Sequence, residues 1–213
     1  MNMMNADFIR NARRQRGAAL LTGLIFMVIL TLLGITAARM AGLEERMSGN
    51  MRDRSLAMQA AERALRDAEL DIREPAAGYT RSPVITGTGI TLFFPSCNND
   101  GTLDTADDAL CDRRGASPTY TSTTIEFPAF SVGANNYPAL SLDMTAAPSV
   151  AYGRFTNAAA ITGLSAQPRY IIEGFKRAQT GSSSEEFFYR VTVRAQGANP
   201  NTVVWLQEIY KPL

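Results

Sequence analysis

The sequence contains no histidine, and among its 213 residues only Lys176 and Lys211 are lysines. Without histidine, the chain lacks the commonest general base, proton shuttle and zinc ligand of enzymes. It also lacks a Gly-rich loop that ends in Gly-Lys-Ser or Gly-Lys-Thr, and a serine in a Gly-x-Ser-x-Gly turn. We therefore expect a protein that is not an enzyme.

Charge is missing over one long stretch, from Ala18 to Ala38. At about 1.5 Å per residue, a helix of this length spans the roughly 30 Å hydrocarbon core of a bilayer. No proline follows before Pro75, and apolar residues recur at steps of 3, 4 or 7. These residues are Leu43, Met47, Met51, Met58, Ala61, Leu65, Ala68 and Ile72. The spacing predicts one helix over 18–74, with a transmembrane segment at 18–38 and an amphipathic second half.

Residues 1–17 carry four arginines and one acid and end in Gly17. A basic cluster before an apolar segment predicts that this end stays in the cytoplasm while the rest is translocated. A Sec-type signal peptide has its small-residue cleavage site after the apolar run, whereas Gly17 stands before it. This order resembles the leader of type IV prepilins, which a prepilin peptidase cuts after the glycine and then methylates. The resemblance makes Ala18 the first mature residue; the alternative is an uncleaved signal anchor.

Three ordered motifs follow in residues 38–69: Leu-Glu-Glu-Arg-Met, Gly-Asn-Met-Arg-Asp and Ala-Ala-Glu-Arg-Ala-Leu. Together they resemble the opening of PilX-type minor pilins of the type IV pilus. A solvated helix face is another interpretation of the same charges, and both can hold. Thr22 stands where most pilins carry a glutamate at the fifth mature position. Some family members without that glutamate, the K-type pseudopilin of type II secretion and PilX-type minor pilins, are placed at or near the tip of the filament.

Residues 75–89 are rich in Gly, Thr, Ser and Pro and predict a linker, followed by a β-rich head over 90–213. Strands are predicted at 90–94 and 120–127, and mostly long loops over 128–167. Three clear strands close the chain, in an order that also resembles the end of PilX-type minor pilins: 169–175, 186–195 and 202–210. Alternation predicts that Tyr189, Val191 and Val193 are buried and that Arg190, Thr192 and Arg194 are exposed.

The fold class is therefore predicted as α+β, with the long helix packed on an antiparallel sheet. Cys97 and Cys111 are the only cysteines. In a segment outside the cytoplasm they are predicted to form a disulfide, the alternative being two free thiols.

The loop between the two cysteines has the spacing of a calcium-binding loop. Counted from Ser96 as position 1, oxygen-bearing side chains fall at positions 3, 5, 7, 9 and 12, and Gly101 falls at position 6. The candidate Ca²⁺ ligands are Asn98, Asp100, Thr102, Asp104 and Asp107. Against calcium, position 1 is not an aspartate, and the Asn-Asn-Asp-Gly run is equally favourable as a simple turn.

Residues 1–17 hold four of the 21 basic and one of the 20 acidic residues, so the mature chain has 17 against 19 and a net charge of −2. No clustered basic face indicates nucleic-acid binding.

The resemblance implies a minor pilin. It would first be a single-pass inner-membrane protein with its head in the periplasm, and then a subunit of the pilus fibre at the cell surface. Its implied partners are other minor pilins, the major pilin, a tip adhesin and the prepilin peptidase, and its implied roles are priming of assembly, adhesion and twitching motility. The alternatives are a K-type pseudopilin of a type II secretion filament and a signal-anchored periplasmic binding or sensor domain.

Overall fold

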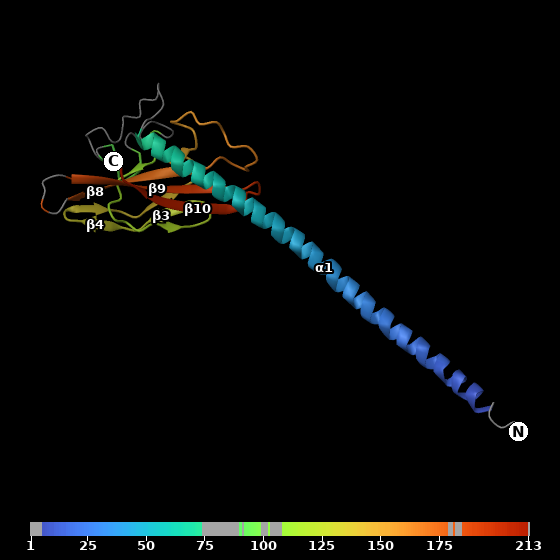
Figure 1. The fold of residues 1–213 in the computed structure, drawn as a ribbon. Helices are drawn as coiled ribbons and strands as arrows, with labels where there is room; N and C mark the ends of the chain where they lie inside the picture. The colour runs from blue at the N-terminus through green and yellow to red at the C-terminus, as the bar shows by residue number, and fades with distance from the viewer. Residues whose placement is uncertain are drawn as a thin grey trace. The chain divides into compact units, whose positions relative to one another are not determined.

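The computed structural model describes residues 6–73, 90, 92–98, 102, 108–178, 181 and 185–212, with side chains from residue 17 onward. One helix, α1 (Ala6–Arg73), runs through the first third of the chain (Figure 1). The predicted helix is thus present, and it begins earlier than expected, because the leader residues from Ala6 are helical too. The chain divides into two compact units, the first ending at Met51 and the second beginning at Arg52. The predicted linker at 75–89 lies outside the described residues.

The main sheet of the second unit is built on the three strands that close the chain. The order along the sheet is β1-β8-β9-β10, and β8, β9 and β10 are antiparallel neighbours as predicted. β1 pairs with β8 in parallel, so the sheet is mixed and not purely antiparallel. β7 adds to the same edge of β8 in antiparallel orientation. The bounds are β1 Leu110–Cys111, β7 Val150–Ala151, β8 Arg169–Ala178, β9 Glu185–Gln196 and β10 Val203–Tyr210.

The second half of α1 packs on this sheet through small side chains. Five alanines and two larger residues of the helix are buried in the core: Ala57, Ala60, Ala61, Ala64, Leu65, Ala68 and Ile72. Alanines let the helix backbone approach the sheet closely, and the larger residues fill the remaining space. The predicted apolar stripe is therefore right for its second part. It is wrong for Leu43, Met47 and Met51, which belong to the first unit and are each about two thirds exposed.

A second layer of short strands covers the other face of the main sheet. Thr192 and Arg194, which the alternation of β9 predicted as exposed, are buried there, and Arg194 donates a hydrogen bond to Ser122 O at 3.0 Å. The prediction of a solvated face is wrong, because a second apolar layer lies where water was expected. The strands are β2 Thr119–Tyr120, β3 Thr124–Phe127 and β6 Leu140–Asp143 in one sheet, with a hairpin of β4 Phe130–Val132 and β5 Asn135–Tyr137.

Three local predictions are corrected. The strand expected at 120–127 is two strands, since a turn in which Thr124 N donates to Thr121 Oγ1 at 3.0 Å separates β2 from β3. The strand expected at 90–94 is absent among its described residues except for a bridge between Phe94 and Cys111. Its apolar residues pack on β8, where a Cβ on Gly174 would lie 2.5 Å from Ile90. The region 128–167, expected to be mostly loop, contains four short strands.

Candidate functional site

The expected processing junction, Gly17 and Ala18, lies within α1, and both residues are exposed. A Cβ atom added at Gly17 would meet no atom within 4 Å, so the fold leaves room for a side chain. In a helix interior glycine is also about 1 kcal/mol less favourable than alanine. The fold of the single chain therefore gives no reason for glycine at this position.

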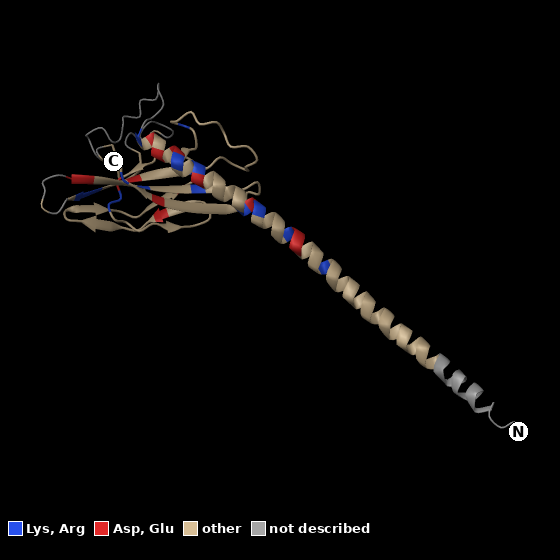
Figure 2. Cartoon of the chain, in the orientation of Figure 1, with Lys and Arg blue, Asp and Glu red and all other residues tan. Residues whose placement is uncertain are grey.

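The apolar segment is exposed along its whole length. Its most apolar window has a mean hydropathy of 2.6, and none of it is buried in the structure. Figure 2 shows this stretch of α1 without any charged residue. Its polar side chains are the three threonines Thr22, Thr31 and Thr36. Each donates its hydroxyl to a carbonyl of the preceding helical turn at 2.8 Å. The segment thus meets the requirement that a helix in lipid satisfies its own polar groups.

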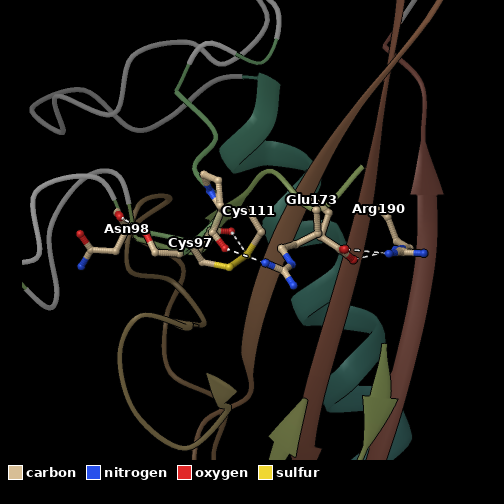
Figure 3. The surroundings of a disulfide bond; sticks show 9 residues. Cys97, Asn98, Cys111, Glu173 and Arg190 are labelled. Atoms are coloured by element: carbon tan, nitrogen blue, oxygen red, sulfur yellow. Dashed lines mark hydrogen bonds and ion pairs between the residues drawn. A yellow bond between two sulfur atoms is a disulfide. The ribbon is translucent and has the colours of Figure 1, made fainter. Parts of the chain in front are cut away.

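Cys97 and Cys111 form the predicted disulfide, and both cysteines are fully buried (Figure 3). Cys111 lies in β1 opposite Glu173 of β8, so the bond ties the start of the cysteine loop to the main sheet. Backbone hydrogen bonds close the base of the loop, with Ala109 N donating to Cys97 O at 3.0 Å. Each end of the acidic loop is therefore held on the folded core.

Two of the five candidate calcium ligands, Asn98 and Thr102, lie among the described residues. Asn98 Nδ2 donates to Thr102 O at 2.6 Å and to Asp108 Oδ1 at 3.1 Å. Asp100, Asp104 and Asp107 lie outside the described residues. In the described part of the chain, no group of three or more His, Cys, Asp or Glu residues is placed to hold a metal ion. Asp108, which the spacing did not single out, is buried beside this turn.

A buried ion pair crosses the main sheet next to the disulfide, and sequence reasoning missed it. Arg190 of β9 donates to both oxygens of Glu173 on β8, at 2.6 and 2.7 Å, and to Ala116 O at 2.8 Å (Figure 3). Glu173 is fully buried, and burial raises its pKa while the bonds from Arg190 oppose the rise. The sequence could have indicated this pair only if the strand register were known, because Glu173 and Arg190 are then direct cross-strand partners.

Three aspartates of α1 hold the head to the helix. Asp53 accepts from Ala198 N at 2.6 Å, in the turn between β9 and β10. Asp67 accepts from Gly153 N at 2.8 Å, and Asp71 accepts from the hydroxyl of Tyr170 at 2.9 Å. The hydrogen bond with Thr202 and those with the turn amides lower the pKa of Asp53, whereas burial raises that of Asp67.

A fourth contact joins the same helix to the last strand through two carboxyl groups. Glu208 of β10 shares a hydrogen bond with Glu69 of α1, and this bond, with burial, raises the pKa of Glu208 to about 7. Two carboxyl groups that share a site cannot both ionise without repulsion. The contact is therefore strongest while Glu208 is protonated.

Two family models match the chain. The model described as PilX N-terminal matches residues 16–66, and the model described as type IV pilus assembly protein PilX C-term matches residues 97–212. The first covers the apolar segment and most of the packed half of α1, and the second covers the disulfide and all ten strands. No curated protein and no solved structure matches.

Proposed function

The chain belongs to the family of the type IV pilus assembly protein PilX and is a minor pilin, and from this membership we propose that it helps to start pilus assembly from a position at or near the tip of the fibre. The observation that carries the proposal is the coincidence of the two family matches with the two parts of the fold. One match takes in the exposed apolar helix, and the other takes in the folded head.

The proposed mechanism is a transfer of residues 18–38 from lipid to a bundle of like segments from other subunits. Both surroundings are apolar, and the segment has no charge to desolvate on the way. Thr22 supports a tip position, because its hydroxyl bonds to Ala18 O and Ala19 O within its own helix. A glutamate at that position would need a partner from a neighbouring subunit, whereas Thr22 needs none.

We propose that a prepilin peptidase cleaves after Gly17 and methylates Ala18. Gly17→Leu tests this, with Gly23→Leu as the matched control, since a Cβ at either glycine meets nothing within 4 Å. Mass spectrometry of the membrane form should find residues 1–17 retained in Gly17→Leu and removed in Gly23→Leu and in the wild type. Removal of the leader from Gly17→Leu, or its retention in the wild type, would contradict the proposal.

The remaining expectations follow from family membership. We propose that the head lies in the periplasm before assembly and reaches the cell surface in the fibre. Its proposed partners are the other minor pilins, the major pilin and a tip adhesin, and its proposed roles are adhesion and twitching motility. A deletion strain complemented with the wild-type chain tests these roles, with surface pili counted before attachment and motility are scored. Unchanged pilus number, attachment and motility in the deletion strain would contradict them.

Calcium binding by the acidic loop is a separate proposal. It is supported by the oxygen-bearing side chains at positions 3, 5, 7, 9 and 12, and by the disulfide that closes the loop. Calorimetric titration of the full chain in detergent with Ca²⁺ tests it, with Asp104→Asn as the variant and Asp143→Asn, outside the loop, as the control. Binding should be lost only in Asp104→Asn. No heat of binding by the wild type at millimolar Ca²⁺ would end the proposal.

A further inference from the structure

The second half of α1 is electrically neutral in sequence, and the fold separates its charges. Residues 52–73 contain five arginines and five acids, and in Figure 2 both colours recur along this part of the helix. All five arginines are exposed: Arg52, Arg54, Arg63, Arg66 and Arg73. Of the five acids only Glu62 is exposed. The separation therefore comes from burial and not from the order of the residues.

The other four acids are used in contacts with the head. Asp53, Asp67 and Asp71 accept hydrogen bonds from it, and Glu69 shares one with Glu208. None of the five arginines belongs to an ion pair between described residues. The exposed surface of residues 52–73 thus carries five positive charges against one negative charge.

Three of these arginines surround an exposed leucine. Leu70 is 50% exposed, and it follows Arg63 by seven residues and Arg66 by four, and precedes Arg73 by three. Residues at these steps lie on one face of a helix, so the four form a strip over the last three turns of α1. We call these four residues the arginine strip. An apolar centre with an arginine-rich rim is typical of a surface that binds another protein.

The arginine strip fits a helix better than it fits a phosphate backbone. Its steps of three and four are those of a seam along which one helix packs against another. Glu62, four residues before Arg66 on the same side, would repel phosphate groups, and a phosphate backbone offers Leu70 no apolar partner. Carboxylates on a helix can instead meet the planar guanidinium groups through paired hydrogen bonds.

We propose that the arginine strip binds a helix of a partner protein that carries carboxylates at steps of three and four around an apolar side chain. The carboxylates accept hydrogen bonds from the three arginines, and the apolar side chain packs against Leu70. The buried side of this half of α1 holds the head, and its exposed side holds the partner. The proposal rests on the proposed function, because assembly with other subunits supplies such a partner.

Peptide binding to the full chain in detergent tests the proposal. The probe is a fluorescent, alanine-rich helical peptide with Glu and Leu along one face at steps of three and four. One counterpart has Gln in place of Glu, and another has the same composition with its Glu residues dispersed around the helix. Fluorescence anisotropy should show saturable binding of the probe and at least tenfold weaker binding of both counterparts. Added salt should weaken binding of the probe, because the charges of the strip are exposed.

Removal of charge from the arginine strip should weaken binding, and removal of charge elsewhere should not. Arg63→Gln combined with Arg66→Gln should weaken binding of the probe at least tenfold. Arg73 is left unchanged, because a base in the last turn of a helix also stabilises the helix itself. The matched control, Lys176→Gln combined with Arg177→Gln, removes the same charge from exposed positions of β8 and should leave binding unchanged.

A variant that strengthens binding separates the proposal from simple misfolding. Glu62→Gln removes the one exposed acid of this half and should tighten binding of the probe about twofold. Weaker binding by Glu62→Gln, with the fluorescence of Trp205 unchanged, would contradict the proposal.

Three further results would overturn it. The first is no binding of the probe at millimolar concentration. The second is equal binding of the peptide with dispersed carboxylates, which would show a general attraction of charge and not a helix seam. The third is tighter binding of a short DNA duplex than of the probe, which would show a nucleic-acid surface.

Leader removal is measured on the same preparations. A chain that is processed at Ala18 but binds no probe refutes this inference alone, whereas a chain that keeps residues 1–17 refutes the proposed function.

Discussion

The two halves of α1 are both rich in apolar residues, and only one of them is buried. From Leu20 to Met51 the large apolar side chains are between 47% and 79% exposed, whereas the core residues of the helix from Ala57 to Ile72 are at most 9% exposed. Residues 18–38 of the front half are apolar on all sides, and the rear half confines its apolar residues to one face. The chain thus stabilises its rear half within one folded unit and leaves the front half to be covered by lipid or by other subunits.

Hydrogen-bonding side chains divide in the same way. In the front half, threonine hydroxyls bond only to carbonyls of their own helix. In the rear half, Asp53, Asp67 and Asp71 reach out to the turns and strands of the head. The polar side chains of the front half therefore tie it to no other part of the chain, whereas those of the rear half bind it to the head.

A matched pair of truncations tests this difference most strongly. Ile72 is fully buried and Ile35 is 51% exposed, and both lie on α1. Ile72→Ala should lower the free energy of unfolding of the head by about 2–5 kcal/mol, the usual cost of a cavity in a core. Ile35→Ala should leave it unchanged. The single tryptophan, Trp205 of β10, gives a fluorescence signal for unfolding of the full chain in detergent. Equal losses in the two variants would contradict the division of the helix.

A charge placed in the front half should weaken membrane anchoring and leave the head folded, whereas the same charge in the rear half should leave both unchanged. Val28→Arg puts a charge at the centre of the apolar segment, where insertion into a bilayer becomes about 3 kcal/mol less favourable. Gln59→Arg puts the same charge on the exposed side of the rear half. Alkaline extraction of membranes should release Val28→Arg and retain Gln59→Arg, while the fluorescence of Trp205 reports a folded head in both. Release of the wild-type chain by the same extraction would show that the front half is not held by lipid.

The attachment of the rear half depends on a close approach between Asp53 and the turn after β9. A Cβ on Gly197 would lie 2.4 Å from Asp53 Oδ1, so Gly197→Ala should displace the carboxylate from the amides of Ala198 and Asn199. Gly197→Ala and Asp53→Asn should each lower the thermal midpoint of the head by a few degrees, and the double variant by little more than one of them. Additive losses would show that the two residues act separately. Gly133→Ala, in the turn of another hairpin, changes a glycine remote from this contact that, unlike Gly197, has a positive φ, and its effect should add to either change.

The smallest expected effect is a pH dependence at the end of the helix. The pKa of Glu208 is raised from its ordinary 4.5 to about 7, chiefly by its hydrogen bond with Glu69. Since the folded value lies above the unfolded one, this contact stabilises the head fully below about pH 4.5 and loses its effect as the pH rises to about 7. Glu208→Gln should remove this part of the pH dependence, as measured by urea unfolding at several pH values. An unchanged profile in Glu208→Gln would exclude the contact as its source.

Sequence periodicity predicted the long helix and the three closing strands, because these elements are long and their patterns are local. It could not tell which part of the apolar stripe is covered, since Met47 and Met58 have the same character and only the head distinguishes them. The short strands from β4 to β7 left no pattern, because two to four residues are too few for alternation. Parallel pairing of β1 with β8 joins residues about 60 positions apart and has no local signal.

The candidate sites divide along similar lines. The disulfide could be predicted from cysteine count and spacing, and the structure contains it. The Glu173–Arg190 pair could not be predicted without the register, because Arg190 fits a solvated face as well as a buried one. Asp53 fitted a solvated helix face equally well, and its turn lies 145 residues further along the chain. Calcium binding and cleavage after Gly17 stay predictions.

Mass spectrometry of the chain recovered from sheared and purified pili tests the central claim most directly, because it reads the fate of the front half of α1. The account predicts that the fibres contain this chain with a methylated amino terminus at Ala18 and without residues 1–17. Its absence from fibres, together with a membrane form that keeps Met1–Gly17, would contradict the account.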